Sequence, residues 1–220
     1  MNRGPVVDAL VGRKAVWGGE VGRLVRLVAV LALTLLSASC GDVTRQGAGS
    51  SYLIINALEA ASGADPTKFG GTLNSDVITV VKDVATIFND LGRVRLSLAM
   101  KDAGGTNSPT SPTTNNFITV NRYRVRFVRA DGRNIPGVDV PYGFDGAFTG
   151  TVGTGELTAG FELVRHIAKV EAPLGALAGN LLIISTIAEI TFYGSDQTGR
   201  EVSVTGQIFV SFGNFGDPDS

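Results

Sequence analysis

The chain has 220 residues, of which 44% are hydrophobic and 18% are charged, and its formal net charge is −1 at pH 7. This length suits one domain with a sizeable core, and the balanced charge gives no overall attraction to nucleic acid. With Cys40 as its only cysteine, the chain has no partner thiol for an internal disulfide.

The first 40 residues have the layout of a secretory signal. Basic residues up to Arg26 precede an apolar run at 27–36, and the small residues 37–39 lead into Cys40. This order resembles the lipobox of bacterial lipoproteins, whose cysteine receives a diacylglyceryl group before cleavage on its N-terminal side. Ser37 stands where that family prefers leucine, which lies one residue earlier. The resemblance implies a membrane anchor through lipid on Cys40.

Other interpretations of this segment are weaker. Only 15 uncharged residues lie between Arg26 and Asp42, whereas a spanning helix needs roughly 20 apolar residues. A buried core helix and a signal without lipid are the remaining alternatives. Acidic residues before Arg23 are unusual for a signal and favour a start codon further along, for example at Val21. Gly41 resembles signals for sorting to the outer membrane, if the organism is Gram-negative.

The mature chain would comprise 181 residues. Five of 19 basic and two of 20 acidic residues precede Cys40, which leaves 14 and 18 and a net charge of −4. We expect a signal peptide at 1–39, the acylated cysteine and a flexible tether at 40–50, a folded domain at 51–214 and a tail at 215–220. This domain contains no cysteine, so packing alone must stabilise it.

The C-terminal part predicts a β-hairpin. Even-numbered positions are mostly apolar from 182 to 192 and again from 202 to 212, on either side of a turn-rich segment at 194–199. The inward-facing residues are Leu182, Ile184, Thr186, Ala188, Ile190 and Phe192, then Val202, Val204, Gly206, Ile208, Val210 and Phe212.

Earlier segments show the same period of two. Strands are predicted at 94–100, 123–127, 52–58, 76–81, 143–152 and 157–170, the last with a bulge between Leu163 and Val164. Residues 81–91 fit a helical stripe, but their β-branched residues favour extended structure, with a single helical turn as the alternative. The polar segment 101–116 is predicted to be a solvated loop.

About nine short strands indicate an all-β fold, a β-sandwich rather than a barrel. The pattern over residues 50–213 resembles the immunoglobulin-like modules common on bacterial surfaces, whose last two strands the terminal hairpin resembles. The core tryptophan and disulfide of antibody domains are missing, because the only tryptophan is Trp17 in the signal.

Catalytic residues are hard to find. The only histidine, His166, shares its parity in the predicted strand with apolar residues, and no G-x-S-x-G is present. Asp131, Asp145 and Asp196 fall in turn-like sequences, where aspartate serves local geometry. We therefore predict no enzyme, no cofactor and no metal site, with a loop-end calcium site built from scattered aspartates left open.

Arginines occupy every second position along parts of two predicted strands, so those of one strand point to the same side. Should these strands pair, one sheet surface would carry Arg93, Arg95, Arg122, Arg124 and Arg126. Such a surface suits anionic polymers, lipid headgroups or an acidic partner. The alternative is that these side chains only solvate the sheet and pair with carboxylates on neighbouring strands.

A partner surface is also predicted on the hairpin. Ile183 and Ile187 point outward near Phe209, and contiguous exposed apolar groups often mark association sites. Alternatively, residues 52–58 cover them. Sugar binding through surface tyrosines is a third option, for which Tyr52, Tyr142 and Tyr193 are available, whereas Tyr123 alternates with core residues.

These observations together predict a lipid-anchored protein of the cell envelope with a structural or protein-interaction role. An envelope protein is the expected partner, and nucleic acid is not. The alternative is a ligand-binding module for anionic polymers or glycans, which acts through the arginines or the loops at one end.

Overall fold

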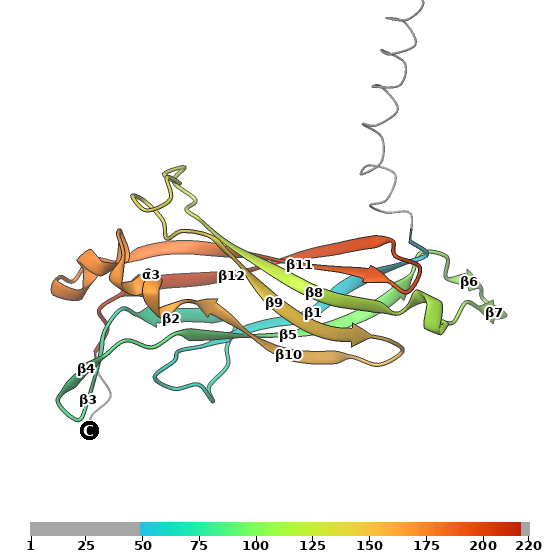
Figure 1. Cartoon of the computed structure of the whole chain (residues 1–220), viewed down its shortest axis with the longest axis horizontal. Coiled ribbons are helices and arrows are strands. Elements are labelled where there is room, and N and C mark those ends of the chain that lie inside the picture. The colour runs from blue at the N-terminus through green and yellow to red at the C-terminus, as the bar shows by residue number, and fades with distance from the viewer. Residues whose placement is uncertain (1–48, 217–220) are drawn as a thin grey trace, which may run out of the picture. The chain divides into compact units, whose positions relative to one another are not determined.

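The computed structural model describes residues 49–216, which form an all-β structure with two main sheets (Figure 1). The smaller sheet has the strand order β1-β5-β10 and is antiparallel throughout. Its strands are β1 (Ser51–Ala61), β5 (Asp90–Met100) and β10 (Leu157–Val164).

The larger sheet has the strand order β2-β12-β11-β8-β9. Its strands are β2 (Thr72–Asp76), β12 (Glu201–Gly213), β11 (Ile184–Asp196), β8 (Ile118–Val128) and β9 (Phe144–Val152). Neighbours are antiparallel except β2, which runs parallel to β12.

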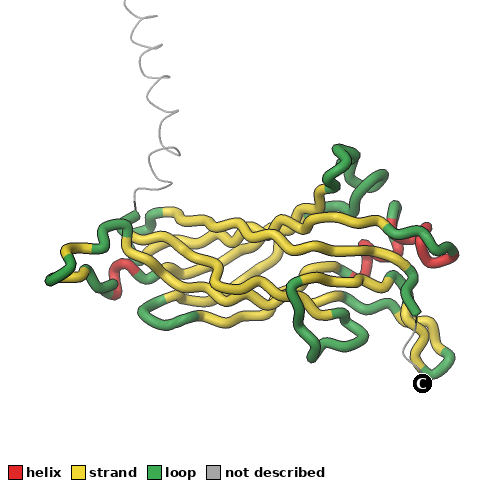
Figure 2. The backbone as a smooth tube through the Cα atoms, turned by 180° about the vertical axis from the view of Figure 1, so that it is seen from behind, coloured by secondary structure: helices red, strands yellow, loops and turns green. Residues whose placement is uncertain are grey.

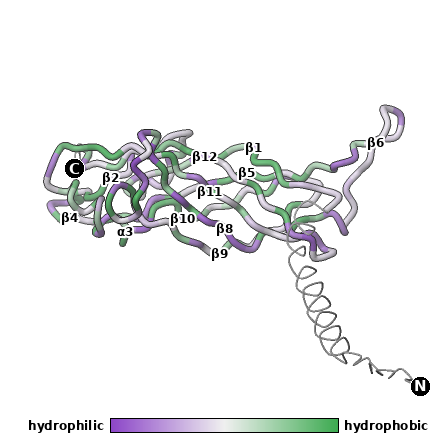
Figure 3. Tube along the Cα trace, turned by 90° about the horizontal axis from the view of Figure 1, so that it is seen from above, coloured by the Kyte–Doolittle hydropathy of each residue, from purple (hydrophilic) through white to green (hydrophobic). Residues whose placement is uncertain are grey.

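Shorter elements lie at the two ends of the sheets (Figure 1). One end carries the hairpin of β3 (Thr79–Val81) and β4 (Val84–Thr86), the helix α3 (His166–Val170) and the 3-10 helix η3 (Leu174–Gly179). The other end carries β6 (Gly104–Gly105), β7 (Ser108–Pro109) and the 3-10 helix η2 (Thr114–Asn116). Figures 2 and 3 show strands in the middle, loops at both ends and a hydrophilic loop around β6.

The core lies between the two sheets, because each sheet buries one face of its alternating strands. Phe161 of β10 contacts Tyr123 and Phe192 of the opposite sheet, with ring centroids 5.2 and 5.4 Å apart. Phe148 also meets Phe192 edge to face at 5.5 Å. Aromatic pairs in such geometry add stabilisation beyond the area they bury.

Most of the predicted strands are confirmed. The terminal hairpin pairs in the expected register, with Phe192 opposite Val204 and Ile187 opposite Phe209. Tyr123 is buried as predicted, and the bulge predicted near Leu163 appears as a register shift between Glu162 and Val164. Residues 104–111 of the polar loop are exposed.

The segment at 81–91 contains no helix. The hairpin of β3 and β4 turns at Lys82 and Asp83, which both have positive φ, at 50° and 63°. A two-residue hairpin loop of this kind matches the twist of the flanking strands. Extended structure was therefore the better of the two alternatives.

Three strand predictions are wrong in part. The strand predicted at 157–170 ends at Val164, because the chain leaves the sheet at Arg165 and forms α3, where His166 is exposed rather than packed. The segment at 76–81 is not one strand, since β2 ends at Asp76 and β3 begins at Thr79. Leu182 precedes β11 and is 68% exposed, so the hairpin alternation begins two residues later.

A buried ion pair connects four parts of the chain. Lys169 of α3 lies 2.9 Å from the Asp90 carboxylate at the start of β5, and their side chains are 1% and 0% exposed. The same carboxylate accepts hydrogen bonds from the Ser75 hydroxyl at 2.6 Å and from the Gly63 amide at 2.9 Å. A buried charge needs such partners, because removing it from water is costly.

Candidate functional site

The outer face of the five-stranded sheet carries most of the predicted site residues. From the β11–β12 turn toward Phe209, the outward side chains of β11 are Tyr193, Thr191, Glu189 and Ile187 in turn. In the middle, the Thr191 and Thr205 hydroxyls share a hydrogen bond of 2.8 Å between paired strands.

The charged part is a network around Asp145 on β9. Arg122 donates to Asp145 Oδ1 at 2.9 Å, and Arg124 contacts both carboxylate oxygens at 3.1 and 3.0 Å. The hydrogen bond from Arg124, followed by that from Arg122, holds the pKa of Asp145 below its usual value. Further along the sheet, Arg126 lies 3.8 Å from Glu189.

The predicted five-arginine surface does not form. β5 and β8 belong to different sheets, so Arg93 and Arg95 are separated from the three arginines of β8. Arg93 pairs with Glu59 at 3.0 Å and stacks over Phe69, and Arg95 lies 4.0 Å from Glu156. As the alternative interpretation expected, each of the five arginines pairs with a carboxylate on a neighbouring segment.

A β-bulge hollows the sheet next to this network. Toward β11, Asn121 is an extra residue of β8, since Val120 pairs with Gly194 and Arg122 with Tyr193. The register toward β9 shifts at the same step, but there the extra residue belongs to β9. Gly194 lies opposite the bulge, and a Cβ there would collide with backbone atoms of Thr119 and Val120. Glycine at this position lets the two backbones approach closely, and bulges of this kind redirect side chains near sites.

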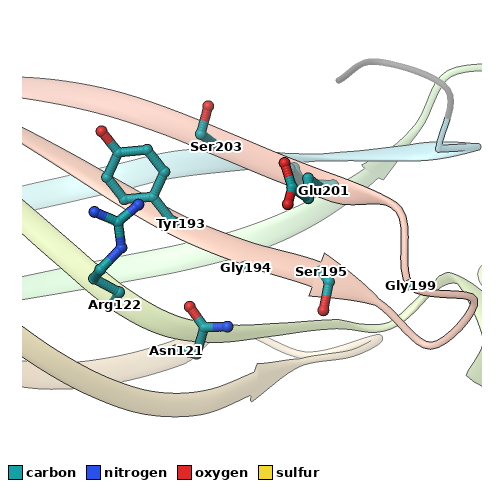
Figure 4. A pocket seen from close by; sticks show the side chains of 9 residues that line it. Asn121, Arg122, Tyr193, Gly194, Ser195, Gly199, Glu201 and Ser203 are labelled. Carbon is teal, nitrogen blue, oxygen red and sulfur yellow. The ribbon is translucent and has the colours of Figure 1, made fainter. Parts of the chain in front are cut away.

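The resulting pocket has a volume of about 450 Å³. Figure 4 shows Tyr193 above Arg122, whose guanidinium carbon lies 4.0 Å from the ring centroid. The pocket is lined by Asn121, Arg122, Tyr193, Gly194, Ser195, Gly199, Glu201, Val202 and Ser203.

The turn beside the pocket is held by Asp196. Its carboxylate accepts hydrogen bonds from the Thr198 hydroxyl at 2.6 Å and from the amides of Thr198 and Arg200, both at 2.9 Å. Burial by itself raises the pKa of Asp196, but the hydrogen bonds from Thr198 and Arg200 outweigh it and leave the pKa lowered. Gly199 completes the turn with a φ of +82°, which glycine adopts without strain.

A second hollow of about 240 Å³ lies on the other side of β12. It shares Glu201, Val202 and Ser203 with the first pocket and adds Tyr52 and Lys101 from β1 and its neighbour. Tyr52 is 44% exposed. Two tyrosines therefore flank the start of β12.

Two of the three residues of the predicted apolar patch are neighbours on the same sheet face, whereas Ile183 precedes β11 and is separated from them by the Ser185–Ser211 pair. Ile187 pairs directly with Phe209, and Ile183 and Phe209 are 56% and 45% exposed. The alternative that residues 52–58 cover this patch is wrong, because they belong to β1 in the opposite sheet.

Two further features concern metal binding and membrane crossing. No group of three or more His, Cys, Asp or Glu side chains within 49–216 is placed to hold a metal ion. Among the same residues no helix has the length and apolar character to cross a bilayer. Cys40 and the segment before it lie outside the described part of the chain.

No family model, curated protein or solved structure matches this chain. No sequence pattern predicts the pocket. Its only local signal is the pair Gly194 and Gly199 around a turn, and the bulge at Asn121 becomes visible only when β8 is aligned with β11.

Proposed function

We propose that this protein is a lipid-anchored, non-catalytic protein of the cell envelope that binds another envelope protein through the outer face of its five-stranded sheet. The observation that carries the proposal is the cross-strand pair of Ile187 with the 45% exposed Phe209, with Ile183, 56% exposed, beyond the next residue pair. The lipobox-like sequence ending at Cys40 supports the anchor, and Gly41 supports sorting to an outer membrane where one exists.

We also propose that the fold is an immunoglobulin-like sandwich, and the strand order supports it. In such domains strands A, B and E share one sheet and strands G, F and C share the other. Here β1-β5-β10 and β12-β11-β8 have that order, and β9 lies beside β8 as strand C′ lies beside C in variable-type domains. A strand corresponding to D is missing from the smaller sheet.

The surroundings of the patch favour a protein as its occupant. Across the sheet, Ile187 also pairs with Val128, so the apolar strip spans three neighbouring strands. One residue pair further, Glu189 accepts a hydrogen bond from Gln207 at 3.2 Å and faces Arg126. An apolar centre with a polar and charged rim is the usual composition of a protein–protein interface.

The test is to replace Phe209 with aspartate and crosslink intact cells. We expect Phe209→Asp to abolish crosslinks to the partner, because a charge in the apolar centre must be desolvated on binding. The melting temperature should change by less than about 2 °C, since exposed substitutions alter stability little. Thr205→Asp, on the same face of the same strand, is the matched control and should keep the crosslinks.

Two outcomes contradict the proposal. Crosslinks that persist in Phe209→Asp place the interface elsewhere. Loss of folding in Phe209→Asp assigns this side chain to an internal core and removes the interface; Ile183→Asp, outside β12, repeats the test at a position that is 56% exposed.

A further inference from the structure

We infer that the hollow formed by the β8 bulge is a binding site for an uncharged oligosaccharide. The site is separate from the apolar patch and does not depend on the proposed anchor. The inference rests on three observations: how the hollow is built, which chemical groups line it, and how it continues across β12.

The hollow is a feature of the sheet itself and not a gap between mobile loops. Asn121 is the extra residue with respect to β11, and Gly194 allows the backbones to approach beside it. A volume of about 450 Å³ is within the range of small-molecule sites. The framework is rigid, because the ladders on both sides of β8 resume directly after the bulge.

The lining groups suit hydroxyl groups better than an ionic ligand. Asn121, Ser195 and Ser203 supply neutral donors and acceptors. Arg122 is the only base in the pocket, and its charge is already paired with Asp145 at 2.9 Å. Glu201, the only acid, further disfavours an anion. An anionic polymer therefore meets no net positive charge here.

Tyr193 and Arg122 supply the planar part of the site. The Arg122 guanidinium stacks over the Tyr193 ring at 4.0 Å and donates a hydrogen bond to Asp145. These two contacts fix its orientation. One N–H group donates to Asp145, and the guanidinium carries five in all, so others are positioned to donate to ligand hydroxyls. Tyrosine combines an apolar ring surface with a polar hydroxyl, which matches the two kinds of surface on a sugar ring.

The hollow continues into a second depression, so the combined site is longer than one sugar unit. Glu201 and Ser203 belong both to this pocket and to the smaller one beside Tyr52 and Lys101. The start of β12 thus separates two depressions, each with a tyrosine. This arrangement fits a chain of several sugar units laid across β12.

The experiment measures binding of full-length protein in detergent to cellotetraose, maltotetraose and chitotetraose by calorimetry. We expect saturable binding of at least one of them, unchanged in 0.5 M salt because no net charge is neutralised; this concentration is chosen for a Debye length of about 4 Å. Ser203→Trp should fill the pocket and Tyr193→Ala should remove the platform, each weakening binding about tenfold or more.

Matched variants separate binding from folding. Gln207→Trp lies four residues further along the same face of β12, outside the lining, and should bind normally. Tyr142→Ala removes a tyrosine that is 51% exposed and does not line the pocket, and it should also bind normally.

Three outcomes would overturn the inference. The first is no binding of any of the three oligosaccharides. The second is binding that Ser203→Trp and Tyr193→Ala leave unchanged while both variants melt like the wild type. The third is binding of heparin alone with loss in high salt, which would indicate an electrostatic polyanion surface instead.

Discussion

Asp90 and Lys169 have the most deeply buried charged side chains among residues 49–216. Both are almost fully buried, and the Asp90 carboxylate has three donors from β2, α3 and the loop after β1. Such a pair adds little net stability compared with apolar residues, but the loss of one partner leaves an uncompensated buried charge. It therefore specifies how these segments meet.

We predict that Lys169→Met lowers the free energy of unfolding by about 3–5 kcal/mol, because Asp90 then stays buried without its cation. Urea unfolding of the full chain measures the change. Lys68→Met is the control: Lys68 also pairs with an aspartate, at 2.6 Å, but its side chain is 85% exposed. The control should leave the unfolding midpoint nearly unchanged, because exposed ion pairs contribute little to stability.

A double-mutant cycle tests the cause. If the penalty arises from the unpaired carboxylate, Asp90→Asn together with Lys169→Met will cost clearly less than the sum of the single changes. Additive effects would show that the two side chains are not coupled and that the ion pair does not organise this end of the core.

At the scale of elements, β11 is the central strand of the larger sheet and has two different faces. Phe192 is completely buried and contacts the rings of Tyr123, Phe148 and Phe161. Thr191 points outward and shares only a hydrogen bond with Thr205. Because side chains alternate along a strand, neighbouring residues of β11 have very different energetic roles.

We predict that Phe192→Ala lowers the free energy of unfolding by about 3–5 kcal/mol through the cavity it leaves. Thr191→Ala should cost less than about 1 kcal/mol, the usual size of a cross-strand pair on an exposed face. Thermal and urea unfolding of both variants measure the two losses in unfolding free energy. Equal midpoints for the two would be incompatible with the register of β11.

For the whole molecule, the expected anchor and the described domain are close together in sequence. Nine positions separate Cys40 from Gly49, where the described residues begin, and Gly49 lies beside Asp196 and Val202 at the β11–β12 turn. The proposed oligosaccharide site is thus at the end of the domain that leads to Cys40, whereas α3, β3 and β4 are at the other end (Figure 1).

We predict that Cys40→Ser releases the protein from membranes or leaves it as an uncleaved precursor. Several acyl chains anchor a protein stably, whereas a single chain binds only marginally, and without the thiol no diacylglyceryl group is attached. Cell fractionation and intact mass of the membrane-bound protein measure the effect. Wild-type protein found entirely in the soluble fraction would contradict the lipoprotein proposal.

The strands of the terminal hairpin, their register and their buried face can be predicted from local sequence alone. These features are local: a period of two marks each strand, and the short turn at 196–199 dictates which residues of β11 and β12 meet. The burial of Tyr123 and the bulge near Leu163 followed from the same alternation.

Only the tertiary structure decided which strands share a sheet. The arginines of β5 and β8 have the same alternating pattern, yet they lie on different sheets, because alternation shows that a face is exposed and not which strand lies beside it. The same holds for the pairing of Asp90 with Lys169, 79 positions apart, and for the pocket at Asn121. These features arise from contacts between distant segments, which carry no local sequence signal.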